Sequence, residues 1–163
     1  MDTPAPADPV VRPYRPAADR AWLEPRLDDG WGGALQARRG ELLDVLDLDG
    51  FVAEVDGEPA GVLTHRPGSD ATELAFLWAF ETRRGIGTAL VRALFDATQG
   101  PVWVVTTNDN VEALAFYERL GFRVRDVRSG AVDDARARLK PSIPVVNSNG
   151  IRVRDEVELT VQR

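Results

Sequence analysis

The pattern of hydrophobic and polar positions predicts a first half of the chain that is rich in strands. Apolar and polar residues alternate over 10–15, as is typical of a strand. Two further apolar runs, 51–55 and 59–64, flank Asp56-Gly57-Glu58. Aspartate and glycine tolerate the backbone of a tight turn, so this arrangement predicts a β-hairpin.

Two helical segments are expected among these strands. Asp19 can cap a short helix that reaches Leu27, although Pro25 disturbs it, and Gly30-Trp31-Gly32-Gly33 then breaks the chain. The spacing of apolar residues over 41–48 predicts a second short helix.

Strands and helices alternate in the second half. The run 102–106 is nearly all apolar and β-branched, which predicts a buried strand. Asn110 can cap the helix that follows, and Gly121 can terminate it. In order, the pattern predicts strands over 74–80, 102–106, 122–127 and 153–161, and helices over 88–98, 111–120 and 132–139.

This order of elements predicts an α+β (mixed α/β) fold. We expect a single central, mostly antiparallel sheet of six to seven strands with helices on both faces. The fourth and fifth strands, 74–80 and 102–106, are joined through a helix and should be parallel, with a right-handed crossover. The length predicts one domain over 10–163, preceded by a flexible N-terminal tail over 1–9.

Charge and missing residue types exclude several classes of function. The net charge is −6, which disfavours a nucleic-acid partner. The chain has no cysteine and one histidine, His65, so zinc–thiolate sites, thiolate catalysis and multi-histidine metal sites are excluded, and we expect no metal. Lys140 is the sole lysine and lies in no Walker motif. No apolar run approaches the length of a membrane helix, so we expect a cytoplasmic protein that contacts no membrane.

The glycine turn Arg83-Arg84-Gly85-Ile86-Gly87-Thr88-Ala89 carries the first candidate chemistry. It lies between a predicted strand and a predicted helix, where successive backbone N–H groups can bind phosphate oxygens. Three interpretations are open: a turn that only ends a strand, a nicotinamide or flavin site, and a site for another phosphate-bearing cofactor. Leu90 stands where a dinucleotide fingerprint needs a third small residue, and four strands precede the turn, which disfavours the second interpretation.

A second motif follows the buried strand and favours the third interpretation. Residues 110–122 read Asn-Val-Glu-Ala-Leu-Ala-Phe-Tyr-Glu-Arg-Leu-Gly-Phe. Together with Gly85 and Gly87 at the earlier turn, this segment resembles the GNAT-type N-acetyltransferases, which use acetyl-coenzyme A. The family pattern is matched in this segment at Asn110, Ala113, Phe116, Tyr117, Gly121 and Phe122, whereas Thr82 replaces the Gln or Arg that the family has before the glycine turn.

The resemblance implies how acetyl-CoA binds. In this family the fourth and fifth strands splay apart, and the pantetheine arm pairs with the fourth strand as an added strand. The residues that the resemblance places at the cofactor are Leu77, Trp78, Ala79, Arg83, Arg84, Gly85, Ile86, Gly87, Thr88, Asn110 and Phe116.

The resemblance also implies catalytic roles. Tyr117 is the candidate general acid for the departing thiolate; otherwise it only packs its helix on the sheet. Glu73, at the start of the fourth strand, is the candidate base for the acceptor amine; otherwise it is a strand-edge charge in solvent. Asp155 and Glu156 on the last strand are its rivals, together with water.

Three further features have two interpretations each. Trp31 either stacks on the acceptor or belongs to the core, and His65 is either a loop residue or a catalytic group. The insert 131–150 contains Pro141 and Pro144 and either shapes the acceptor site or forms a dimer surface. The charges over 151–156 either face solvent or bind a zwitterionic acceptor.

The resemblance therefore implies an enzyme that moves an acetyl group from acetyl-CoA to a primary amine, directly within a ternary complex. A covalent acyl-enzyme is disfavoured because the chain has no cysteine and no serine in a recognisable nucleophile motif. The alternative is a non-catalytic sensor or interaction module that binds acyl-CoA. The expected partner is a small-molecule or peptide amine, and the sequence leaves a homodimer open.

Overall fold

The computed structural model describes residues 1, 3–82 and 84–163. Its elements in chain order are β1 (Val10–Tyr14), α1 (Pro16–Gly30), β2 (Leu35–Arg38), β3 (Glu41–Asp44), a 3-10 turn (Val45–Asp47), β4 (Gly50–Val55), β5 (Glu58–Pro67), β6 (Thr72–Ala79), α2 (Ile86–Ala97), β7 (Val102–Thr107), α3 (Val111–Arg119), β8 (Arg123–Arg128), α4 (Ala131–Arg138) and β9 (Glu156–Val161).

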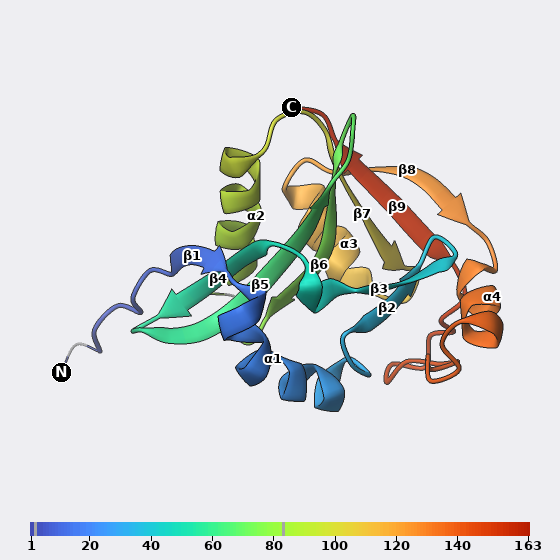
Figure 1. Ribbon diagram of the computed structural model, residues 1–163, viewed down its shortest axis with the longest axis horizontal. Helices are drawn as coiled ribbons and strands as arrows, with labels where there is room; N and C mark the ends of the chain where they lie inside the picture. The colour runs from blue at the N-terminus through green and yellow to red at the C-terminus, as the bar shows by residue number, and fades with distance from the viewer. Residues whose placement is uncertain (2, 83) are drawn as a thin grey trace.

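A mixed sheet organises the molecule, as the sequence predicted. Across the described residues it has seven strands in the order β1-β4-β5-β6-β7-β9-β8, and β2 and β3 form a separate hairpin (Figure 1). Every neighbouring pair in the large sheet is antiparallel except β6 and β7. These two are the predicted fourth and fifth strands, and their parallel pairing is confirmed.

Helices cover both faces of this sheet. Successive side chains along its strands point to opposite faces, so each face carries its own apolar core. Val52 and Val62 face a core formed with α1, while their neighbours Ala53 and Leu63 face a core formed with α2 and α3. Fully buried leucines of α1 and α2, such as Leu23 and Leu90, anchor the helices to the two faces.

The helix predicted over 41–48 is wrong. Residues 41–44 form β3, which pairs with β2, and only Val45–Asp47 is helical, as a 3-10 turn. Arg39 and Gly40 both have positive φ, 52° and 77°, which is the backbone of a tight two-residue hairpin. The apolar spacing was compatible with a helix, but the hairpin turn and its partner strand decided the conformation.

Helix α1 is longer than predicted and Asp19 does not occupy its N-cap position. Arg15 is the N-cap, and the Asp19 carboxylate reaches back to accept the Arg15 backbone N–H at 2.8 Å. Asp19 also accepts hydrogen bonds from Arg12 and from the Trp22 indole. Burial opposes ionisation of Asp19, but these donors outweigh it and lower its pKa to about 2.

The last strand is shorter than predicted, because β9 begins at Glu156 rather than at residue 153. The Asn108 side-chain oxygen accepts the backbone N–H groups of Arg154 and Asp155, both at 2.9 Å. The N–H of Val153 bonds the carbonyl of Val145 in the preceding loop. These bonds hold residues 153–155 outside the sheet.

The parallel strands β6 and β7 part soon after they meet. Only Thr72, Glu73 and Leu74 pair with β7, opposite Val102, Trp103 and Val104. The register of β6 against β5 also shifts at this point and leaves Ala75 unpaired, as in a β-bulge. Because a bulge bends its strand, residues 75–79 diverge from β7, and the predicted splay is confirmed.

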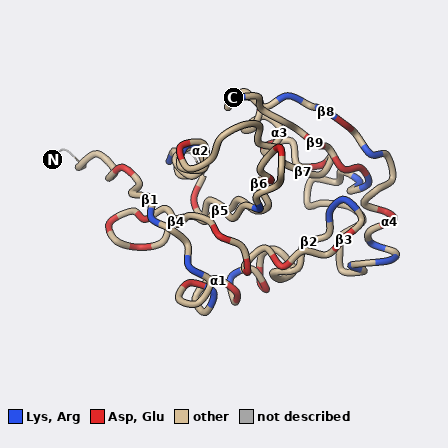
Figure 2. Tube along the Cα trace, turned by 45° about the horizontal axis from the view of Figure 1, so that its top comes forward, with Lys and Arg blue, Asp and Glu red and all other residues tan. Residues whose placement is uncertain are grey.

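Acidic and basic positions are interspersed along the chain rather than gathered in one basic patch (Figure 2). Within the described ranges, no helix has both the length and the apolar character to cross a membrane.

Candidate functional site

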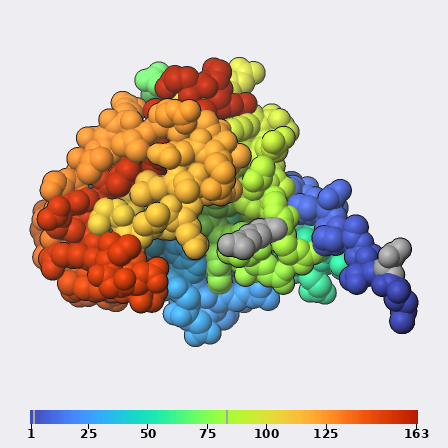
Figure 3. Space-filling model, turned by 180° about the vertical axis from the view of Figure 1, so that it is seen from behind, coloured from blue at the N-terminus to red at the C-terminus, as the bar shows by residue number. Residues whose placement is uncertain are grey.

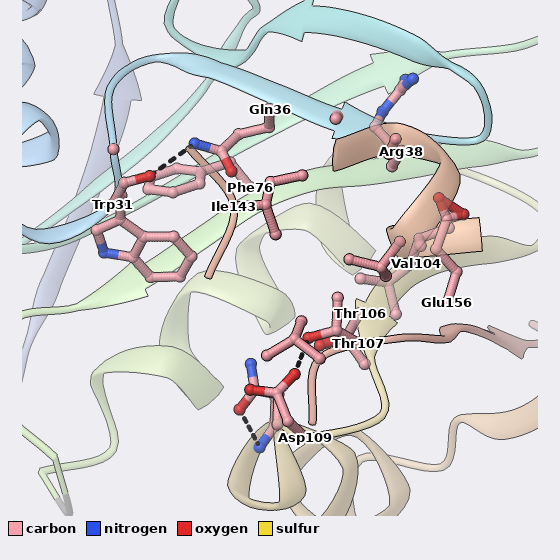
Figure 4. Close-up of a pocket in the computed structure, with 18 of the residues that line it drawn as sticks. Trp31, Gln36, Arg38, Phe76, Val104, Thr106, Thr107, Asp109, Ile143 and Glu156 are labelled. Atoms are coloured by element: carbon pink, nitrogen blue, oxygen red, sulfur yellow. Dashed lines mark hydrogen bonds between the residues drawn. The ribbon is translucent and has the colours of Figure 1, made fainter. Parts of the chain in front are cut away.

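A cavity of about 550 Å³ lies where β6 and β7 diverge (Figure 4). Its floor consists of residues 73–77 of β6 and 104–107 of β7, and the first turns of α3 close one side. Its walls come from the end of α1, from β2 and from the insert 131–150, which contains α4. Figure 3 shows this insert, in orange to red, beside α3 in yellow.

The N-terminus of α2 lies at the predicted glycine turn. Gly85 is the N-cap with φ of 71°, a left-handed conformation that favours glycine, and no described side chain caps the helix. The first backbone N–H groups of α2, from Ile86, Gly87 and Thr88, therefore remain available to an anion. Arg84 is exposed and pairs with Glu81 at 2.8 Å, whereas the predicted contribution of Arg83 lies outside the described residues.

Gly87 permits close packing between α2 and α3. A Cβ at this position would lie 3.1 Å from the Phe116 ring. The Phe116 ring of α3 therefore packs against the first turn of α2. Asn110 caps α3 by accepting the Ala113 N–H at 3.3 Å, and it also lines the cavity. Leu77 lines the cavity from β6, and Trp78 and Ala79 continue the strand along the edge that β7 leaves unpaired.

Tyr117 reaches the cavity from α3. Its ring packs against Phe116 and Phe122, with centroids 5.3 Å away in each case. Its side chain is buried, and burial raises the pKa of Tyr117 well above the ordinary value of a phenol. Among the described residues its hydroxyl has no hydrogen-bond partner. The phenol is therefore protonated at neutral pH and can donate to a group bound in the cavity.

Glu73 is buried rather than exposed at a strand edge. Its two carboxylate oxygens accept bonds from Arg38, at 2.9 and 2.8 Å, and Arg66 lies 3.1 Å from the same carboxylate. Glu73 lines the cavity, which is compatible with a role as the base for the acceptor amine. Its ion pair with Arg38 also has a structural effect. It ties the β2–β3 hairpin to the central sheet.

The two rival carboxylates are placed differently. Glu156 lines the cavity and accepts the Arg39 backbone N–H at 2.8 Å, with Arg128 3.3 Å away. Asp155 precedes β9, does not line the cavity, and accepts the Gly130 N–H at the start of α4. The hydrogen bond from Arg154 is the main reason that the pKa of Asp155 is lowered.

Trp31 lines the cavity, where it could contact an acceptor. Its ring lies 5.1 Å from that of Phe76 and it is 36% exposed. His65, in contrast, lies within β5, stacks on Phe51 at 5.9 Å and does not line the cavity. The insert over 131–150 forms a wall of the cavity, as predicted in one of its interpretations.

Sequence reasoning missed three residues that line this cavity. Arg38 pairs with Glu73, Asp109 accepts bonds from Thr107 and Asn147, and Lys140 donates to the Leu35 carbonyl at 2.7 Å. Of these three, only Lys140 stood out in the sequence. It is the sole lysine, and it lies between a predicted helix and the segment that contains Pro141 and Pro144. The described residues contain no group of three His, Asp or Glu side chains placed to hold a metal ion.

Comparison with known proteins assigns the family. A model of the acetyltransferase (GNAT) family matches residues 14–122, more than half of the chain. The chain belongs to the GNAT acetyltransferase family. The matched range includes β6, β7, the glycine turn and α3 with Tyr117, whereas the insert with Lys140 and the strand with Glu156 lie beyond it.

Relatives and solved structures of GNAT proteins agree with this assignment. The Bacillus subtilis (strain 168) protein YdhI is 37% identical over 132 residues, which cover 78% of this chain and 82% of that protein. An IAA acetyltransferase from Bacillus cereus superposes with a TM-score of 0.73 at 20% identity, over 96% of this chain and 100% of that one. A GNAT acetyltransferase from Elizabethkingia anophelis with acetyl-CoA bound gives a TM-score of 0.69 at 18% identity, over 96% and 99%. At such identities the two structures show the shared fold.

Proposed function

We propose that this GNAT protein transfers the acetyl group of acetyl-CoA to a primary amine, directly and within a ternary complex. The observation that carries the proposal is the separation of β6 from β7 beyond Leu74, which opens a cavity lined by Leu77 and Tyr117, together with the uncapped N-terminus of α2, which follows β6 along the chain. A solved structure with the same fold holds acetyl-CoA, which supports this choice of co-substrate.

The pantetheine arm of CoA would pair with the open edge of β6 at Leu77, Trp78 and Ala79, in the manner of an added strand. Its diphosphate would accept the N–H groups at the start of α2, where the helix dipole favours negative charge. This placement directs the thioester toward the cavity below Tyr117.

The proton movements assign roles to the polar groups of the cavity. The amine nitrogen attacks the thioester carbonyl, the C–S bond breaks, and the departing thiolate takes a proton from the Tyr117 hydroxyl. The amine must lose a proton, and Glu73, Glu156 or water accepts it. Glu73 and Glu156 both line the cavity, which supports them over Asp155.

Titration with CoA and assay of thiol release test the proposal together. The wild type should bind CoA in calorimetry and release free CoA from acetyl-CoA faster when amines are added. Gly87→Val should weaken CoA binding about tenfold, or about 1.4 kcal/mol, because the new side chain displaces Phe116 and blocks the N–H groups of α2. Arg92→Ala, on the exposed face of α2, is the matched control.

The outcomes separate an enzyme from a sensor. If the protein does not bind CoA in the titration, both the enzyme and the sensor are ruled out. Binding of CoA without thiol release for any amine favours the non-catalytic sensor.

The role of Glu73 is tested by the pH–rate profile of Glu73→Gln. If Glu73 accepts the proton of the amine, kcat/KM should fall roughly 100-fold and the acidic limb of the profile should disappear. Glu156→Gln is the parallel comparison, since Glu156 lines the same cavity and is the other candidate base; loss of the acidic limb in Glu156→Gln alone would assign the base to Glu156. If the acidic limb of the profile is unaltered in Glu73→Gln and the midpoint of thermal unfolding is lower, Glu73 is not the base. Its role is then the ion pair with Arg38.

A further inference from the structure

The acceptor half of the cavity has apolar walls. Trp31 faces it from the turn after α1, Phe76 from β6 and Ile143 from the insert (Figure 4), and Pro144 lines it beside Ile143. Trp31 keeps about a third of its surface exposed, whereas Phe76 is buried behind it. A partly exposed indole opposite aliphatic side chains favours a compact apolar group between them.

Most charged side chains that line the cavity already have a partner of opposite charge or matched donors. Glu73 pairs with Arg38, and Glu156 accepts bonds from the Arg39 N–H and from Arg128. The carboxylate of Asp109 accepts bonds from the Thr107 hydroxyl and the Asn147 amide. Because these carboxylates already have partners in the protein, they do not favour a substrate with a second positive charge.

Lys140 is different from the other charged groups of the cavity. Its ammonium donates to the Leu35 carbonyl at 2.7 Å, and within residues 1, 3–82 and 84–163 no carboxylate lies within 4.0 Å of it. The side chain is partly buried, and this burial lowers the pKa of Lys140. A partly desolvated cation without a counter-ion is stabilised when an anion binds beside it.

We propose that the acceptor is a small amine that also carries a carboxylate, with Lys140 binding the carboxylate and the walls around Trp31 enclosing an apolar body. The amine then points down the cavity toward Tyr117 and the thioester. This inference rests on the proposed function and specifies its substrate class. It makes Lys140 a residue that determines specificity.

Two matched pairs of probes test the proposal in a thiol-release assay with acetyl-CoA. The first pair is 4-(aminomethyl)benzoate and 4-methylbenzylamine, and the second is phenylalanine and 2-phenylethylamine. The members of each pair differ in the carboxylate alone or in its replacement by a methyl group. In at least one pair, kcat/KM should be about tenfold or more higher for the member with the carboxylate.

The variants assign this preference to Lys140. Lys140→Met should abolish the preference by raising KM for the carboxylate probe, while KM for acetyl-CoA and for the probe that lacks the carboxylate stays the same. Lys140→Arg should retain it. Trp31→Ala should raise KM for both members of a pair about equally. Leu42→Ala, at an exposed apolar residue of β3 that does not line the cavity, should change neither KM.

Several results would overturn the proposal. Equal or faster turnover of both amines that lack the carboxylate, or of spermidine or an alanine tetrapeptide amide, would show another acceptor class. A preference that survives in Lys140→Met would remove Lys140 from recognition. If CoA binds but none of these amines is acetylated, the acceptor class is wrong while cofactor binding stands, and failure to bind CoA would instead overturn the proposed function itself.

Discussion

Replacing Tyr117 by phenylalanine is expected to lower kcat roughly 100-fold or more. The substitution removes the one phenol that lines the cavity, so the thiolate of CoA must leave without a positioned proton donor. Because burial raises the pKa of Tyr117, the wild-type phenol keeps its proton at neutral pH and is in the form that an acid requires. The measurement is steady-state release of CoA over a range of pH, with saturating amine.

The chain supplies a matched control, because it contains only one other tyrosine. Tyr14 is buried, does not line the cavity and donates a hydrogen bond to the Leu46 carbonyl at 2.8 Å. Tyr14→Phe should cost about 1 kcal/mol of unfolding free energy and leave kcat unchanged. Tyr117→Phe should instead lower kcat and leave the free energy of unfolding unchanged, since no hydrogen bond of its hydroxyl is lost within the described structure. Unchanged turnover of Tyr117→Phe at every pH would remove Tyr117 as the acid.

Replacing Arg38 by methionine is expected to lower the free energy of unfolding by about 3–5 kcal/mol. Both Arg38 and Glu73 are buried, and the substitution leaves the Glu73 carboxylate with only the more exposed Arg66. For a chain of this size the midpoint of thermal unfolding should fall by roughly 6–20 °C. Urea unfolding followed by circular dichroism gives the free energy directly.

A second substitution distinguishes loss of charge pairing from loss of packing. In the double variant Arg38→Met, Glu73→Leu the buried carboxylate is gone, so most of the lost stability should return. Arg138→Met breaks an exposed pair with Asp134 and should be indistinguishable from the wild type. If the double variant is no more stable than Arg38→Met, the buried ion pair is not the cause.

Local patterns were sufficient where a few neighbouring residues decide the structure. Gly85 lies at the turn between a strand and a helix, as the sequence predicted, and Asn110 caps α3 as expected from its place before an apolar helix. In contrast, residues 41–44 joined a strand despite helical spacing, because pairing with β2 outweighed the local preference. The spacing of apolar residues cannot distinguish the two outcomes in so short a segment.

The candidate site shows the same division. Tyr117, Glu73, Glu156 and Trp31 all line the cavity that the sequence led us to expect, while Asp155 does not. No pattern in the sequence associates Arg38 with Glu73, since 35 residues separate them. Their pairing depends on the β2–β3 hairpin folding over the sheet.

By itself the sequence determined the family, the order of most strands and helices, and the glycine turn at the start of α2. These features depend on contiguous residues, whose backbone preferences and spacing act locally. Only the tertiary structure decided which charges are buried and paired, where β6 and β7 separate, and that the insert brings Lys140 to the cavity. The energy of a buried charge depends on the groups that surround it in space, and the chain brings those groups together from distant positions.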